Sequence, residues 1–187
     1  ELIETGKPER GDIAVFKYPL EPNVDYIKRI VGLPGDRIVY RDKQLFIQPQ
    51  CDEGAECPPV RISREPVEAD ETYFSGGGSL DMYQERLGDV SHRILVDPRV
   101  RPRVPLYYKQ PGTSAGEFVV PEGHYFAMGD NRDNSQDSRY WGFVPEEYLV
   151  GRAFFVWMSF EMNRGPDSVL PSWVPTGVRF ERLGSIE

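Results

Sequence analysis

Short, mainly hydrophobic runs, separated by turn residues, occur toward both ends of the chain. Four runs rich in β-branched and aromatic residues come first, at 12–18, 24–31, 36–40 and 44–48. Four more follow later, at 117–121, 124–128, 153–160 and 177–183. Turns at intervals of about eight to twelve residues are typical of an all-β fold. We therefore predict an all-β protein built from antiparallel sheets.

The stretch between these two regions is polar and rich in loops. It contains the glycine-rich run SGGGS, which is typical of a flexible loop. Its strand patterns are weaker, and they occur at 91–97 and 105–109. We predict that residues 49–117 form an inserted β-rich subdomain. The core would then consist of residues 1–48 and 118–187.

Composition places further limits on the fold and on the partners. Eighteen glycines and seventeen prolines disfavour long helices, so we expect only a short helical turn at 145–149, with Pro145 in the first helical position. The net charge of −8 argues against nucleic acid as a partner, because binding to phosphates requires a basic face. No run reaches the roughly 20 apolar residues of a membrane span, and no signal segment opens the chain. We therefore expect a soluble part of a longer protein.

The two cysteines, Cys51 and Cys57, lie close together in the polar segment QCDEGAECP. Their spacing allows a small disulfide loop, which would indicate an oxidising compartment. The alternative is a pair of free thiols in a cytosolic protein. A zinc site would need a second pair of ligands, and neither His92 nor His124 has a ligand-like neighbour. We expect no metal and no cofactor.

One lysine stands in an apolar row within the segment VDYIKRIVGLPGD. Side chains alternate between the two faces of a strand, so Lys28 shares its face with apolar residues, namely Val24, Tyr26 and Ile30. In one interpretation the lysine extends its ammonium group into water. In the other the amine is desolvated, which lowers its pKa and makes it a general base or a Schiff-base nucleophile. On the opposite face, Asp25 lies four residues before Arg29, and we expect these two to pair.

A second notable segment, GDNRDNSQDSRYWGFVP, spans residues 129–145. Asp133, Ser135 and Asp137 have the spacing of the first calcium ligands of an EF-hand. The sixth position of that loop requires glycine and the twelfth requires glutamate, whereas this chain has Ser138 and Val144. The mismatch at both positions rejects a calcium site.

Two other interpretations of the same segment remain. It can be a rigid loop held by its own hydrogen bonds and by an ion pair of Arg139 with Asp137 or with Asp130. The rigid loop can also direct one hydroxyl group at a reacting group, since loops on a scaffold often carry catalysis. The residues alone do not choose between Ser135 and Ser138 for that role.

The ordered set RGDIAVFKYP, DYIKRIVGLPGD, GDNRDNSQDSRYWGFVP and GRAFFVWMS resembles the conserved boxes of bacterial type I signal peptidases. The resemblance covers residues 6–48 and 118–187. It is strongest to the Gram-negative form, which carries an inserted β subdomain with two cysteines. These are membrane-anchored serine endopeptidases that remove signal peptides from exported proteins. The resemblance implies the Ser–Lys protease core shared with repressor-type proteins, anchorage in the inner membrane and a domain that faces the periplasm.

The resemblance also assigns roles to individual residues. Lys28 would take the proton from the nucleophilic serine, and Ser135 would orient the lysine amine, so these two are the candidate catalytic residues. The candidates for loop support are Asp130, Asp137, Arg139 and Arg29. The candidates for binding an extended signal peptide, with small side chains at positions −1 and −3, are Val15, Asp25, Tyr26 and Ile27.

The chain departs from the family pattern at the nucleophile. The family places it in a Ser-x-Ser-Met motif upstream of the sequence Arg-Gly-Asp, which is Arg10-Gly11-Asp12 here. Four serines precede residue 100, and none is followed by methionine: Ser63, Ser75, Ser79 and Ser91. We therefore expect this chain to be inactive alone. Part of the substrate groove would be missing, and its exposed apolar edge would favour self-association.

Two alternatives to a signal peptidase remain open on the sequence. The first is a self-cleaving Ser–Lys protease of the repressor type, which would carry a DNA-binding domain and lack the insertion. The acidic charge and the cysteine pair argue against it. The second is a non-catalytic binding module on the same scaffold. The presence of both Lys28 and Ser135 argues against this alternative.

Overall fold

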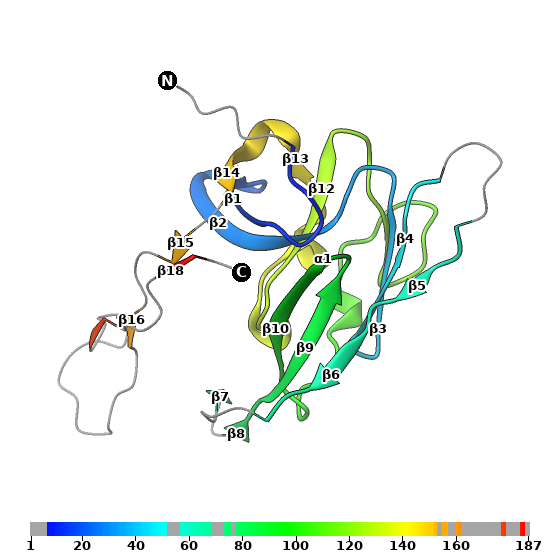
Figure 1. Cartoon of the computed structure of the whole chain (residues 1–187). Coiled ribbons are helices and arrows are strands. Elements are labelled where there is room, and N and C mark those ends of the chain that lie inside the picture. Colours follow the sequence, from blue (N-terminus) through cyan, green and yellow to red (C-terminus); the bar gives the residue numbers. More distant parts are fainter. Residues whose placement is uncertain are drawn as a thin grey trace. The chain divides into compact units, whose positions relative to one another are not determined.

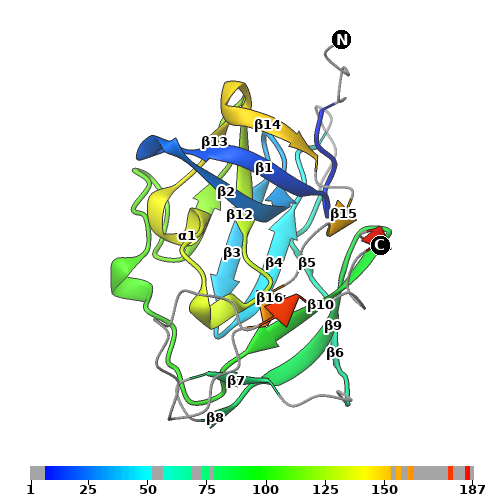
Figure 2. The same ribbon diagram turned by 90° about the vertical axis from the view of Figure 1, so that its left-hand side faces the viewer.

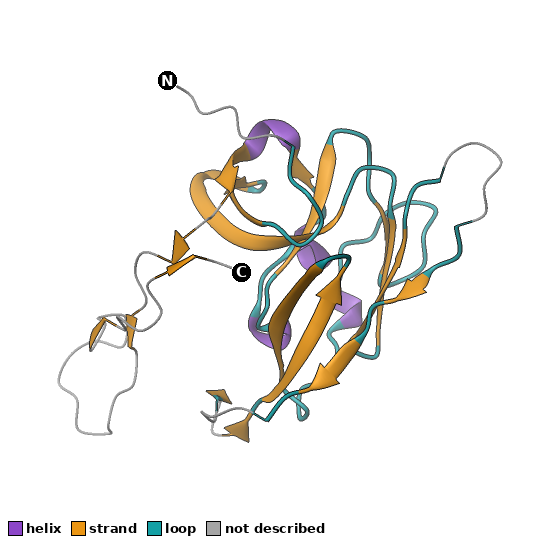
Figure 3. Cartoon of the chain, in the orientation of Figure 1, coloured by secondary structure: helices purple, strands orange, loops and turns teal. Residues whose placement is uncertain are grey.

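Antiparallel β-strands make up most of the regular secondary structure among the described residues, where the helices are short turns (Figure 3). The fold is a computed structural model, which describes residues 7–51, 57–68, 73–75, 78–152, 155–156, 160–161, 177–178 and 184–185. The chain divides into two compact units, Glu1–Arg152 and Ala153–Glu187. The all-β prediction is confirmed.

The first sheet of the larger unit has five strands in the order β13-β12-β2-β1-β14, with the long β2 at its centre (Figure 1). Its strands are β1 (Ile13–Tyr18), β2 (Glu21–Gly32), β12 (His124–Met128), β13 (Val144–Pro145) and β14 (Leu149–Arg152). Hydrophobic residues of β1, β2 and β12 pack together in one of the two core clusters, which includes Ala14, Phe16, Ile30, Tyr125, Ala127, Trp141 and Val144.

The second sheet has four strands in the order β11-β3-β4-β5. They are β3 (Arg37–Arg41), β4 (Gln44–Gln48), β5 (Val60–Arg61) and β11 (Glu117–Val119). The turn that leads from β2 into this sheet has Gly35 at a φ of 82°, as the third residue of a type II turn requires. Asp42 and Lys43 both have positive φ at the tip of the β3–β4 hairpin, which is the geometry of a type I′ turn.

The third sheet, with the order β10-β9-β6, lies within the predicted insertion. Its strands are β6 (Arg64–Pro66), β9 (Asp81–Leu87) and β10 (Val90–Val96). A small hairpin of β7 (Phe74–Ser75) and β8 (Gly78–Ser79) lies between β6 and β9 in the sequence. In contrast, β5 pairs with the core strand β4. The division into a core and a subdomain at residues 49–117 stays a prediction.

The described residues of the smaller unit form two short strand pairs. β15 (Phe155–Val156) pairs with β18 (Gly184–Ser185), and β16 (Phe160–Glu161) pairs with β17 (Gly177–Val178). The strands predicted at 153–160 and 177–183 lie partly outside the described residues.

The helical elements correct one strand prediction. The strand expected at 105–109 is wrong, because η1 (Val104–Leu106) is a 3₁₀-helix with Pro105 in its first turn, where proline's fixed φ is favourable. The other helical elements are η2 (Arg132–Asn134), α1 (Ser138–Trp141) and η3 (Glu146–Tyr148). η3 matches the expected turn at 145–149, but Pro145 precedes its first helical residue. Within the described ranges, no helix is long and apolar enough to cross a membrane.

Candidate active site

Lys28 lies on the core-facing side of β2. It pairs across the sheet with Ala14 of β1, which is buried, and its own side chain is half-buried. The Nζ atom lies 5.4 Å from the centroid of the Tyr26 ring. The predicted apolar row is buried only at the Ile30 end, because Val24 is 38% exposed.

The surroundings of Lys28 shift its amine toward the neutral form. Burial lowers the pKa of Lys28 below its ordinary value of 10.5, because desolvation disfavours the charged form. The negative charges of Asp137 and Asp130 act in the opposite direction, and the positive charge of Arg139 again lowers the pKa. The net direction is downward, as a general base requires.

Ser135 approaches the same lysine from the loop that follows β12. A Cβ atom placed on Gly129 would collide with Ser135 Oγ and would lie 3.7 Å from Lys28 Cδ. Both side chains therefore border Gly129, whose missing side chain leaves room for them. The Ser135 Oγ atom is buried and has no hydrogen-bond partner among the described residues. The structure brings Lys28 and Ser135 together with one hydroxyl still available.

Ser138, the other candidate hydroxyl, has a different role. Its Oγ accepts a hydrogen bond of 2.9 Å from the backbone N–H of Ala127 in β12, and the residue is fully buried. Ser138 is the first residue of the short helix α1. It therefore fastens α1 to the sheet, and the geometry favours Ser135 as the serine that acts on Lys28.

An internal ion pair holds the loop. The Asp137 carboxylate accepts hydrogen bonds from Arg139 Nε and Nη2, both at 2.8 Å, and from the backbone N–H of Gly129 at 3.0 Å. Both side chains are almost completely buried. Burial alone would lower the pKa of Arg139, but the carboxylate of Asp137 outweighs it and raises that pKa. Of the two ion pairs that the sequence allowed for Arg139, the structure forms the one with Asp137.

Arg29 fastens the start of the loop to β2. Its Nε and Nη2 atoms donate to the two carboxylate oxygens of Asp130 at 2.9 and 2.8 Å, and Nη1 donates to the carbonyl of Gly11 at 2.7 Å. The expected pair between Asp25 and Arg29 is wrong. Asp25 is exposed and pairs with Lys17 at 3.0 Å, because Arg29 finds a bidentate partner in the loop.

Comparison with known proteins identifies the family. The family model described as signal peptidase, peptidase S26, matches residues 2–158.

The chain belongs to the signal peptidase family. The signal peptidase I of Buchnera aphidicola from Acyrthosiphon pisum is 42% identical, over 99% of this chain and 63% of that protein. The signal peptidase I of Pseudomonas fluorescens is 46% identical, over 85% of this chain and 52% of that protein. The chain thus spans between about half and two thirds of the length of these relatives. A crystal structure of a signal peptidase I from Enterococcus faecalis is 27% identical over 80% of this chain and 99% of that chain, with a TM-score of 0.44.

The candidate substrate residues of this family member lie on both faces of the β1–β2 ladder. Tyr26 pairs with Phe16 and shares the face of Lys28, whereas Val15 and Ile27 pair with each other on the opposite face. Ile27 is 56% exposed. β12 pairs with β2 only at residues 29–32. Within the described residues, the adjoining part of β2 therefore has a free edge beside Lys28. Substrate binding along it stays a prediction.

Sequence reasoning missed a buried ion pair behind the loop of this signal peptidase domain. Arg132 of η2 donates to the carboxylate of Glu85 in β9, and both side chains are 1% exposed. Burial alone would raise the pKa of Glu85, but Arg132 and His92 outweigh it and lower that pKa to about 2. Arg132 lies in the segment GDNRDNSQDSRYWGFVP, which is the only sequence signal for this pair. Glu85 lies in a polar segment without a recognisable pattern.

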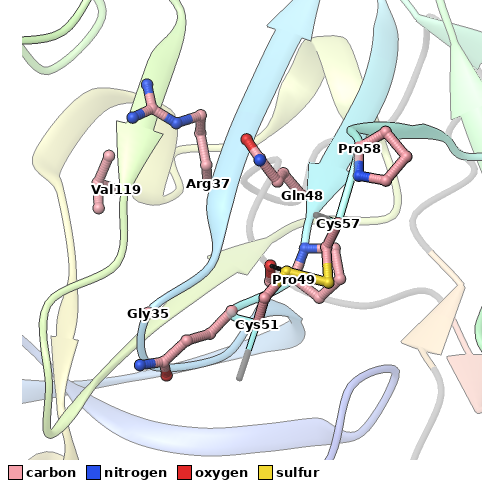
Figure 4. A pocket seen from close by; sticks show the side chains of 9 residues that line it. Gly35, Arg37, Gln48, Pro49, Cys51, Cys57, Pro58 and Val119 are labelled. Atoms are coloured by element: carbon pink, nitrogen blue, oxygen red, sulfur yellow. Dashed lines mark hydrogen bonds between the residues drawn. A yellow bond between two sulfur atoms is a disulfide. The ribbon is translucent and has the colours of Figure 1, made fainter. Parts of the chain in front are cut away.

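A well-formed pocket elsewhere is separate from the candidate active site (Figure 4). Its volume is about 680 Å³, and its lining includes the disulfide between Cys51 and Cys57, whose Cα atoms lie 6.0 Å apart. Arg37 and Val119 also line it, whereas Lys28 and Ser135 do not. The part of the chain that the structure describes contains no cluster of metal ligands.

Proposed function

We propose that this chain carries the general base of a serine endopeptidase that cleaves signal peptides from exported proteins after a small-x-small motif. The observation that carries this proposal is the half-buried amine of Lys28, with its lowered pKa, beside the unpartnered hydroxyl of Ser135. Membership of the signal peptidase family supplies the reaction class.

In the proposed reaction, a serine hydroxyl attacks the scissile carbonyl while neutral Lys28 takes its proton. A neutral amine is required because an ammonium group has no free electron pair for that proton. The Ser135 hydroxyl would hold the amine in the direction of the nucleophile, as the third member of a triad orients the base. The loop itself is held at both ends by ion pairs, from Asp130 to Arg29 and from Asp137 to Arg139.

The nucleophile would come from outside these 187 residues, because the sequence contains no Ser-x-Ser-Met motif. The same segment would supply part of the oxyanion hole and of the substrate groove. Residues 1–187 alone are then inactive, and their uncovered apolar edge favours self-association. The disulfide is consistent with an oxidising compartment, and we place the domain on the periplasmic side of the inner membrane.

The substrate would bind as an added strand. The free edge of β2 next to Lys28 offers unpaired backbone groups to an extended peptide. Ile27 and Val15 on one face and Tyr26 on the other would contact alternate side chains of that peptide. Small side chains at the −1 and −3 positions would let its backbone come within reach of Lys28.

A cleavage assay tests the proposed function. Residues 1–187 are compared with the same residues preceded by their natural upstream segment, using a preprotein whose signal peptide ends in Ala-x-Ala. We expect the longer protein to cut after the second alanine and the 187-residue chain to leave the preprotein intact. Failure of the longer protein to cut would favour a binding module. Equal cutting by the 187-residue chain would show that the nucleophile lies within it.

A further inference from the structure

Contacts at three residues of the loop that carries Ser135, namely Asp130, Asp133 and Arg132, tie it to the insertion and the β3–β4 hairpin. In Figure 2, η2 lies close to β10, and the backbone N–H of Leu95 in β10 donates to the carbonyl of Asp130 at 2.9 Å. The backbone N–H of Asp97 and the Nζ atom of Lys43 donate to Asp133 at 2.9 and 3.0 Å. Arg132 contributes the buried ion pair with Glu85.

The pair of Glu85 and Arg132 differs from a surface ion pair in two respects. Both side chains are excluded from solvent, so neither charge can turn to water if its partner is lost. The guanidinium group makes two hydrogen bonds to the two carboxylate oxygens, and this forked contact fixes the orientation as well as the distance. Ser135 follows Arg132 by three residues, at the C-terminal end of η2.

A further side chain of the inserted sheet lies between the pair and the β2 strand. His92 Nε2 is 3.3 Å from Glu85 Oε1 and 3.9 Å from Asp130 Oδ1. Asp130 in turn binds Arg29, the neighbour of Lys28 in β2. Polar side chains, most of them charged, therefore follow one another from β9 to the strand of the lysine.

We propose that Glu85 and Arg132 are positioning residues, through which the inserted sheet holds Ser135 against Lys28 and keeps water from the lysine amine. The expected effect on cleavage rests on the proposed function. The expected effect on the Lys28 amine does not rest on it. The insertion then has a role in catalysis without contacting the substrate. If the pair is lost, the loop moves away from Gly129 and the amine becomes hydrated.

The test replaces both partners at once, as Glu85→Leu/Arg132→Met. Replacing a buried ion pair by apolar residues of similar size often preserves the fold, so effects on the site can be separated from unfolding. We expect NMR titration of the 187-residue chain to show that the pKa of Lys28 rises toward 10.5. In the longer protein, we expect kcat to fall about 10²-fold with KM unchanged, as for a misplacement of about 1 Å. Arg86→Met, an exposed change in the same strand β9, should alter neither quantity.

A folded double variant with the original Lys28 pKa and kcat would overturn the proposal, because the pair would then be structural only. Should the double variant not fold, Glu85→Gln keeps the shape and one acceptor oxygen, and the same two measurements decide. The titration needs no enzyme activity. A rise in the Lys28 pKa in a protein that never cleaves a preprotein would therefore support positioning while refuting the proposed function.

Discussion

Replacing Lys28 by methionine is expected to abolish cleavage by the longer protein, with kcat reduced by about 10⁴-fold. Methionine preserves most of the apolar stem that packs beside Ala14 and Tyr26, so the fold should survive. What is lost is the group that accepts the proton of the nucleophile. Single-turnover cleavage of a preprotein measures the loss, because this assay separates chemistry from product release.

Two further variants test whether Lys28 acts as a base or through its positive charge. Lys28→Arg retains a positive charge, but a guanidinium group cannot lose its proton in a protein, so we expect it to be as inactive as Lys28→Met. Lys109→Met removes an exposed lysine and should leave the rate unchanged. Substantial activity in Lys28→Arg would mean that residue 28 acts through its charge, and the base role would then be wrong.

The substitution Asp137→Asn is expected to lower the free energy of unfolding by about 3–5 kcal/mol. The carboxylate is fully buried and accepts hydrogen bonds from Arg139 and from Gly129. Asparagine offers one acceptor oxygen and no charge, so the buried guanidinium of Arg139 would lose its counter-ion. Against a total stability of roughly 5–15 kcal/mol for a typical domain, this loss is large. Urea denaturation of the 187-residue chain measures it.

The matched control for Asp137→Asn is Asp89→Asn, which makes the same chemical change at an exposed position. We expect the control to alter the free energy of unfolding by less than about 0.5 kcal/mol. If Asp137→Asn were equally mild, the loop would not depend on its internal ion pair, and another contact would have to hold Ser135.

The strands formed by compact hydrophobic runs were predictable because each one carries its own pattern. The predictions at 44–48 and 124–128 coincide with β4 and β12. β9 was missed because its sequence DMYQERL lacks such a pattern. Pairing with its neighbours β6 and β10 holds it as a strand. The residues of β9 by themselves do not reveal these pairings.

The candidate site was predictable only in part, for a related reason. Resemblance to signal peptidases singled out Lys28 and Ser135, both of which the structure places beside Gly129. The partner of Arg29 could not be found from local spacing. Asp25 lies four residues away, but the actual partner, Asp130, lies 101 residues away. Glu85 was missed for the same reason, since its partner Arg132 is 47 residues away.

The most direct test of this account is an NMR titration of the Lys28 side chain in the 187-residue chain, with its signals assigned by the Lys28→Arg variant. The account predicts a pKa below the ordinary 10.5, because burial disfavours the ammonium form. In the Ser135→Ala variant the fold should persist. A Lys28 pKa at or above 10.5 would contradict the account, since the surroundings would then not disfavour the ammonium form.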